Sequence, residues 1–182
     1  MSETILVTGA SAGFGQAICR RLVADGYRVI GSARRIDKLH ALQEELGEAF
    51  YPLQMDVTDL SQVDHALASL PKAWERVDVL VNNAGLALGL APAYEAEIAD
   101  WLTMIQTNIV GLTYLTRKIL PQMVERNDGY IINLGSTAGT VPYPGANVYG
   151  ASKAFVKQFS LNLRADLAGK KIRVSNIEPG LC

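Results

Sequence analysis

Short apolar runs alternate with segments of helical periodicity along the whole 182-residue chain. Most of these runs are continuously apolar rather than alternating, which is typical of parallel strands covered on both faces. The segments between them are long enough for right-handed crossover helices, which would cover both faces of the sheet. The sequence therefore predicts one α/β domain, a doubly wound parallel sheet in a three-layer αβα arrangement. The predicted strands are Ile5–Val7, Tyr27–Ala33, Ala49–Met55, Val77–Val81, Tyr130–Leu134 and Ile172–Ile177.

The longest helical pattern runs from Ile98 to Arg126, where apolar residues recur at three- and four-residue steps. Asn108 falls within this apolar stripe, and a buried amide needs hydrogen-bond partners or water. Asn108 is therefore either a satisfied packing residue or a residue that holds a water and bends the helix. Pro121 predicts a second kink near the end of the helix.

A glycine-rich segment, Thr8–Gly15, joins the first predicted strand to the helical pattern of Gln16–Asp25. Glycines in such a turn let the backbone approach a ligand where a Cβ would clash. The free N–H groups and the positive dipole end of the following helix favour a phosphate. The spacing G-x-x-x-G-x-G is a variant of the dinucleotide-binding fingerprint, although an ordinary glycine-rich turn could have the same form.

Two arginines, Arg34 and Arg35, follow the second predicted strand. An NAD-binding site usually has an acidic residue there, which binds the ribose 2′-hydroxyl. A guanidinium instead suits the 2′-phosphate of NADP by charge and by geometry. Arginines are also common in solvated loops, but this strand end favours NADP. Asp37 comes after the arginines and is expected to begin the next helix.

Residues that could contact a cofactor also follow two other predicted strands. Asp56 could accept a hydrogen bond from an adenine amino group, or it could help to cap the helix that begins near Asp59. Asn82–Gly85 brings small and amide residues to the end of the fourth strand, where asparagines are also frequent turn formers.

The fifth strand leads to Ser136, and Tyr149 and Lys153 follow at the start of the next helical segment. A spacing of four places Tyr149 and Lys153 on one helix face. A free tyrosine, with a pKa of about 10, is a poor acid or base at neutral pH, but a neighbouring ammonium favours the phenolate. Tyr149 is therefore a candidate for proton transfer, although such a pair is more often an ordinary surface pair.

Composition excludes several other classes of protein. Hydrophobic residues make up 49% of the chain and charged residues 19%, with a net charge of -1, which indicates a globular protein. There is no basic stripe for nucleic acid, no apolar run long enough to span a bilayer, and no secretion-signal pattern. Cys19 and Cys182 lack metal-type spacing, which favours free thiols in the cytoplasm. His40 and His65 lie in polar helical segments and are expected at the surface.

Taken together, these residues resemble the short-chain dehydrogenase/reductase family, in the family's order and over nearly the whole chain. The motifs that carry the resemblance are Thr8–Gly15, Asn82–Gly85, Asn108 with Gly111, Ser136, Tyr149 with Lys153, and Pro179–Gly180. Within the family, Asn82–Gly89 and Asn176–Leu181 look like the NADP-dependent 3-hydroxy acid dehydrogenases, which are also described as serine or allo-threonine dehydrogenases. The resemblance implies a Rossmann-like sheet.

The resemblance also implies the roles of the site residues. Tyr149 would be the general acid and base, and Ser136 would hydrogen-bond the reacting oxygen of the substrate. Lys153 would bind the nicotinamide ribose and tune Tyr149, while Asn108 would anchor a proton-relay water. The residues implied to bind NADP are Gly9, Ser11, Gly13, Phe14 and Gly15 at the pyrophosphate and ribose, Arg34 and Arg35 at the 2′-phosphate, Asp56 and Val57 at the adenine, Asn83 at the adjacent ribose region, and Ala84, Gly85, Tyr149, Lys153, Pro179 and Gly180.

The family continues past Pro179–Gly180 with a substrate-covering segment and a last strand, whereas this sequence stops at Cys182. We therefore expect residues 1–182 to form one NADP-binding domain that includes the catalytic residues but lacks the family's last strand. The expected function is hydride transfer between NADP and a small 3-hydroxy acid, by a cytoplasmic homo-oligomer, a tetramer or a dimer by resemblance. The alternative is a catalytically weak NADP-binding fragment or regulator. A methyltransferase is disfavoured by Arg34 and Arg35.

Overall fold

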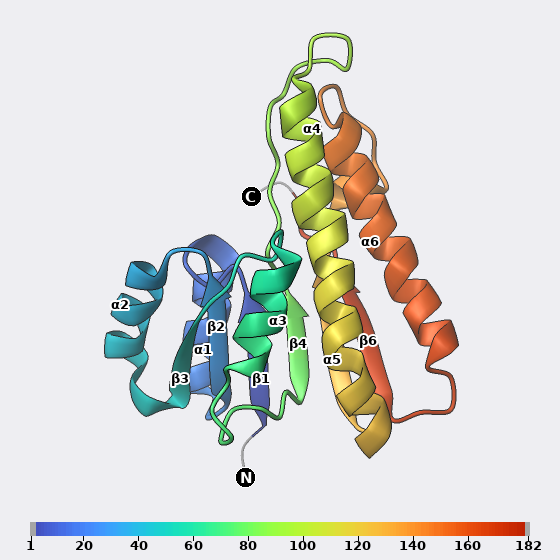
Figure 1. The fold of residues 1–182 in the computed structure, drawn as a ribbon. Helices are drawn as coiled ribbons and strands as arrows, with labels where there is room; N and C mark the ends of the chain where they lie inside the picture. Colours follow the sequence, from blue (N-terminus) through green and yellow to red (C-terminus); the bar gives the residue numbers. More distant parts are fainter. Residues whose placement is uncertain (1–2, 181–182) are drawn as a thin grey trace.

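The computed structural model describes residues 3–180, whose strands form one parallel sheet (Figure 1). The strand order is β3-β2-β1-β4-β5-β6. The predicted doubly wound sheet is therefore confirmed, and the chain reverses its direction of winding between β1 and β4, where such sheets bind ligands. The strands are β1 (Thr4–Thr8), β2 (Arg28–Ala33), β3 (Phe50–Gln54), β4 (Val79–Asn82), β5 (Gly129–Leu134) and β6 (Ile172–Ile177).

Helices cover both faces of the sheet, which gives the three predicted layers (Figure 1). Two helices lie on one face, α1 (Gly13–Ala24) and α2 (Ile36–Leu46). The other face is covered by α3 (Leu60–Ala68), α5 (Leu112–Arg126) and α6 (Asn147–Asp166).

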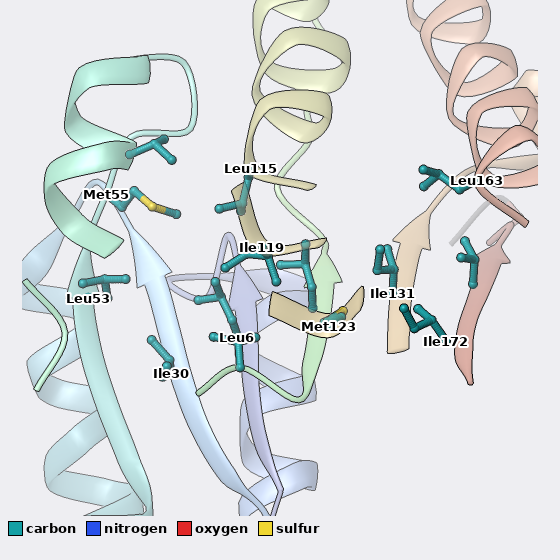
Figure 2. Close-up of a cluster of buried hydrophobic side chains, with 14 of the residues drawn as sticks. Leu6, Ile30, Leu53, Met55, Leu115, Ile119, Met123, Ile131, Leu163 and Ile172 are labelled. Carbon is teal, nitrogen blue, oxygen red and sulfur yellow. The ribbon is translucent and has the colours of Figure 1, made fainter. Parts of the chain in front are cut away.

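The core is divided between the two faces because successive residues of a strand point to opposite sides. On β1, Leu6 belongs to the cluster that also contains residues of α3, α5 and α6, while Val7 belongs to the cluster that contains residues of α1 and α2. Figure 2 shows the first of these clusters, in which Leu115 and Ile119 of α5 lie above Leu6. Burial on both faces explains why the central strands β1, β2 and β4 are mainly apolar, whereas β6, at the edge of the sheet, carries the exposed Arg173.

The long helix predicted for Ile98–Arg126 is interrupted by a π-helical segment, Gln106–Gly111. This segment joins α4 (Ile98–Ile105) to α5, and it contains Asn108. Pro121 lies inside α5, which continues through it to Arg126.

A chain of buried polar side chains crosses the sheet beside these helices. Asn82 Nδ2 donates to Thr116 Oγ1 at 3.0 Å and to Asn133 Oδ1 at 2.9 Å. Asn133 Nδ2 donates in turn to Ser160 Oγ at 2.9 Å. This chain links β4, β5, α5 and α6 below the carboxyl ends of the strands, so it fixes the helices that carry Asn108 and Tyr149.

Candidate active site

The glycine-rich turn lies between β1 and α1, as the sequence predicted. Gly9 and Gly13 have φ angles of +69° and +53°, which favour glycine. A Cβ on Gly15 would come within 2.2 Å of the Gly9 carbonyl oxygen, so Gly15 allows the turn to close tightly. The N-cap residue of α1 is Ala12, which has no side-chain oxygen for the first N–H groups of the helix. These groups are therefore placed to bind an anion.

Thr8 and Asn83 fasten this turn to the end of β4. The Thr8 hydroxyl accepts hydrogen bonds from the backbone N–H groups of Asn83 and Ala84, at 3.0 and 2.8 Å. The Asn83 side chain donates to the Thr8 carbonyl oxygen at 2.8 Å. The turn is thus held rigidly at the reversal point between β1 and β4.

A cavity of about 480 Å³ opens above this turn, and we refer to it as the arginine hollow. Arg34 and Arg35 lie at its edge, and Arg35 Nη2 donates to Ser11 Oγ at 3.1 Å. The hollow therefore carries two guanidinium groups beside a helix N-terminus, which suits a ligand with several phosphates. It is lined by Gly9, Ser11, Ala12, Gly13, Phe14, Ser32, Ala33, Arg34, Arg35, Met55, Asp56, Val57, Thr58, Asn83, Ala84, Gly85, Leu86, Thr103 and Thr107.

A second cavity, of about 670 Å³, contains the predicted catalytic residues, and we refer to it as the tyrosine hollow. Ser136, Tyr149 and Lys153 all line it. The two hollows share Phe14, Asn83, Gly85 and Leu86, so they form one continuous groove along the carboxyl ends of the strands. The other residues of the tyrosine hollow are Ala87, Leu134, Gly135, Thr137, Ala138, Val141, Tyr143, Pro179 and Gly180.

Lys153 is the buried cation of the tyrosine hollow. Its ammonium donates to the Leu134 carbonyl oxygen at 2.8 Å and lies 5.8 Å from the centroid of the Tyr149 ring. Burial disfavours the charged form and lowers the pKa of Lys153 from 10.5 to about 8. The predicted Tyr149 and Lys153 pair therefore shares one helix face and one cavity.

Asn108 lies behind the groove rather than in it. Its amide group accepts from Leu86 N at 3.0 Å and donates to Leu86 O at 2.9 Å and to Ser152 Oγ at 3.0 Å. The Asn108 side chain is thus satisfied within the protein, which agrees with the first alternative, while the helix departs from α geometry at the same point, which agrees with the bend expected in the second. Asn108 links the loop after β4 to the helix that carries Tyr149.

Other sequence-based expectations can be checked in the same region. The capping alternative for Asp56 is wrong, because Asp59 is the N-cap residue of α3 and accepts from Gln62 N at 3.0 Å. Asp56 instead accepts from Thr58 N and Thr58 Oγ1, at 2.9 and 2.7 Å, while it lines the arginine hollow. Gly15 lines neither hollow, since it packs under the turn.

Leu181 and Cys182 lie outside the described residues. Within residues 3–180, Asp37 is in the first turn of α2, and both histidines are exposed, as expected. Cys19 is a buried free thiol, and burial raises its pKa to about 12.

Sequence reasoning missed the loop residues that complete the walls of the groove. Val141 and Tyr143 reach the tyrosine hollow from the segment after Ser136, and both are exposed. Large apolar side chains in a loop that follows a candidate catalytic serine were the available signal. Ser32 was missed as well, and its buried hydroxyl has no hydrogen-bond partner.

The residues present fit a phosphorylated dinucleotide. A Cβ on Gly13 would meet nothing within 4 Å, so the turn is open toward the groove, while Arg34 and Arg35 supply positive charge. Residues 3–180 contain no group of histidine, cysteine or acidic side chains that could hold a metal ion. Among the helices of these residues, none combines the length and the apolar character that a bilayer crossing requires.

Comparisons with known proteins agree with this geometry. A family model described as short chain dehydrogenase matches residues 3–182. The chain is 58% identical to an NADP-dependent 3-hydroxy acid dehydrogenase of Escherichia coli K12, covering 97% of this chain and 71% of that protein. It is 53% identical to a serine 3-dehydrogenase of Agrobacterium fabrum, covering 100% and 73%. A solved closed form of serine dehydrogenase complexed with NADP+ matches with a TM-score of 0.97 and 58% identity, covering 98% of this chain and 72% of that one.

Proposed function

The chain belongs to the short-chain dehydrogenase family, and from this premise we propose that it is an NADP-dependent oxidoreductase acting on a small 3-hydroxy acid. The substrate is a serine- or allo-threonine-like alcohol or the corresponding oxo acid. Bound NADP supplies the hydride acceptor, and the protein supplies binding, orientation and the proton.

In this proposal Tyr149 takes the proton from the substrate hydroxyl during oxidation and returns it during reduction. Ser136 hydrogen-bonds the same oxygen, and Lys153 favours the ionised form of Tyr149. The support is that all three side chains line the tyrosine hollow. Asn108 anchors a water of the proton relay. Because its side chain already bonds Leu86 and Ser152, we assign this contact to its backbone carbonyl.

The cofactor extends along the groove from one hollow to the other. Its 2′-phosphate lies at Arg34 and Arg35, its adenine at Asp56 and Val57, and its nicotinamide at the tyrosine hollow. The pyrophosphate lies over the glycine-rich turn, where the N-terminus of α1 lacks a side-chain cap. The remaining residues assigned to NADP are Gly9, Ser11, Gly13, Phe14, Asn83, Ala84, Gly85, Tyr149, Lys153, Pro179 and Gly180. Gly15 lines neither hollow, so we assign it an indirect role, in which it lets the glycine-rich turn close tightly.

One observation carries the proposal: the arginine hollow and the tyrosine hollow share four lining residues and so form one groove. The test is turnover of the chain with NADP and a panel that contains serine, threonine and other 3-hydroxy acids. The formation of NADPH is measured by its fluorescence. We expect NADPH formation with 3-hydroxy acids, and formation at least about 10²-fold slower with the Tyr149→Phe variant. NADP binding without any turnover would favour a regulator or a catalytically weak form with the same fold.

We also propose that the protein assembles as a homotetramer. The support is that α4 exposes Ile98 and Leu102, at 63% and 59%, while α6 exposes Phe155 and Leu161, at 37% and 45%. Exposed apolar groups of this kind favour association between copies. Light scattering after size-exclusion chromatography should give four chains, and Leu102→Lys should reduce that number.

We further propose a cytoplasmic location, which suits a free buried thiol such as Cys19. Fractionation of cells that express the chain tests this proposal. Recovery with the membrane or the exported fraction would contradict it.

A further inference from the structure

Helix α6 carries a third polar residue in line with the two that face the tyrosine hollow. Tyr149, Lys153 and Lys157 are spaced four residues apart, so they follow one side of the helix. Lys157 Nζ donates to Thr140 Oγ1 at 2.9 Å, and it lies 3.3 Å from Glu178 Oε1. Lys157 therefore contacts two segments that are separate in sequence: the loop after Ser136 and the residues after β6.

Glu178 has a second partner in Asn176. Asn176 Nδ2 donates to Glu178 Oε1 at 2.9 Å, so this oxygen accepts from both an amide and an ammonium. The Asn176 side chain lies against Gly135, since a Cβ on Gly135 would come within 2.6 Å of Asn176 Oδ1. The contacts thus continue from Lys157 through Glu178 and Asn176 to the residue before Ser136.

Backbone hydrogen bonds extend the pairing of β5 and β6 beyond both strands. Gly135 N donates to Ile177 O at 2.7 Å, and Thr137 N donates to Pro179 O at 3.1 Å. Ser136 lies between these two donors. Pro179 and Gly180 line the tyrosine hollow together with Ser136 and Thr137, and we refer to Pro179–Gly180 as the C-terminal wall.

We propose that Lys157 and Glu178 are positioning residues that hold the C-terminal wall against Ser136 and thereby set how tightly the tyrosine hollow binds NADP(H). This proposal rests on the proposed function, because it assigns the nicotinamide end of the cofactor to this hollow. Neither side chain lines the hollow, so both act through the backbone of Pro179 and Thr137. Glu178 also anchors Asn176, which distinguishes this pair from an isolated ion pair at the surface.

The experiment compares Lys157→Met, which keeps the aliphatic part of the side chain but removes its charge, with Lys157→Arg, which keeps the charge. Lys118→Met is the matched control, because Lys118 is 40% exposed and Lys157 is 42% exposed, and its ion pair with Asp64 lies outside both hollows. Two quantities are measured for each variant. They are the dissociation constant for NADPH, by fluorescence titration, and the hydrogen-exchange rate of the Thr137 amide.

We expect Lys157→Met to weaken NADPH binding by about two- to fivefold, the range of a partly exposed ion pair, and to speed exchange at Thr137. Lys157→Arg should restore both quantities, and Lys118→Met should change neither. The double variant that combines Glu178→Gln with Lys157→Met should bind NADPH no more weakly, and exchange the Thr137 amide no faster, than the more affected single variant. The reason is that both substitutions remove one contact.

The two readouts separate this inference from the proposed function. Unchanged exchange at Thr137 in Lys157→Met would overturn the positioning role, whatever the cofactor does. Faster exchange with unchanged NADPH binding would overturn the link to the cofactor. If the unsubstituted chain bound no NADPH, the proposed function and the link to the cofactor would both fail, while exchange at Thr137 would still decide whether Lys157 holds the wall.

Discussion

The Lys153 ammonium donates a hydrogen bond to the Leu134 carbonyl oxygen, 2.8 Å away, where β5 ends. This bond joins α6 to the strand that leads into Ser136. It also keeps a cation in a buried position, and burial lowers the pKa of Lys153 to about 8. A buried charge with this pKa makes folding dependent on pH.

The first prediction is that Lys153 makes the chain more stable as the pH rises from 8 to 10.5. In that range the folded chain has lost the Lys153 proton, whereas the unfolded chain, with its ordinary pKa of 10.5, still holds it. Because the unfolded state then binds more protons, the free energy of unfolding rises with pH. The contribution reaches about 3 kcal/mol. Below pH 8 the full cost of burying the charge remains.

Urea titrations at several pH values measure this dependence. Lys153→Met should lose this rise in the free energy of unfolding. The difference in unfolding free energy between the variant and the unsubstituted chain should therefore change between pH 8 and pH 10.5. Lys38→Met, at an exposed position on α2, should keep the dependence of the unsubstituted chain. An identical pH profile for Lys153→Met and the unsubstituted chain would contradict the prediction.

The second prediction concerns proton transfer. Tyr149→Phe should lower the turnover number by at least about 10²-fold, because a positioned acid or base contributes roughly 10²–10⁴-fold. Its affinity for NADPH should stay close to that of the unsubstituted chain. Tyr143→Phe is the control, since Tyr143 lines the same hollow. Near-normal turnover by Tyr149→Phe would mean that the proton moves through another group.

The third prediction concerns the choice of cofactor. Replacing Arg34 and Arg35 by alanine should erase most of the preference for NADP over NAD, by about tenfold or more, since each charged hydrogen bond contributes up to a few kcal/mol before screening. Isothermal titration calorimetry at low and moderate salt measures the affinities for NADP and for NAD. Arg20→Ala, on α1 and paired with Glu45, should leave the preference intact. Equal affinities of the unsubstituted chain for both cofactors would refute the assignment.

The fourth prediction concerns the buried polar chain that crosses the sheet. Asn133→Ala should lower the free energy of unfolding by roughly 1–3 kcal/mol, because buried groups of Asn82 and Ser160 lose a partner. Chemical denaturation measures the loss. Asn162→Ala removes an exposed amide from α6 and should cost much less. A similar loss of unfolding free energy in both variants would show that the buried hydrogen bonds stabilise the fold no more than an exposed one does.

The sequence predicted the fold well because each strand carries its own signal. Burial on both faces makes a strand such as β4 continuously apolar from Val79 to Val81, and that pattern can be read without knowing its neighbours. The glycine-rich turn and the pair of Tyr149 and Lys153 were also local patterns, of fixed spacing. Their positions in one groove follow from the sheet topology.

Other features depend on contacts that spacing alone does not encode. Asn108 was recognised as an anomaly, but its partners, Leu86 and Ser152, come from different segments. The contact between Lys157 and Glu178 joins residues 21 positions apart through a strand and a loop. In Asp56 and Asp59 the sequence offered two acids near one helix start, and the hydrogen bond that the Asp59 carboxylate accepts from Gln62 N identifies Asp59 as the cap.

The π-helical segment makes the chain sensitive to its own length between Gln106 and Gly111. Each residue turns an α-helix by about 100°, and a π turn accommodates one residue more than an α turn. Deleting a single residue here would let the helix run as a regular α-helix with α4 and α5 still in phase, so Met104 would keep its place in the core. The deletion would instead remove the wider turn that contains Asn108, and with it the local geometry that sets Asn108 against Leu86. Length variation among relatives should therefore accumulate in the loops before α4 and after Ser136, and be rare within these six residues.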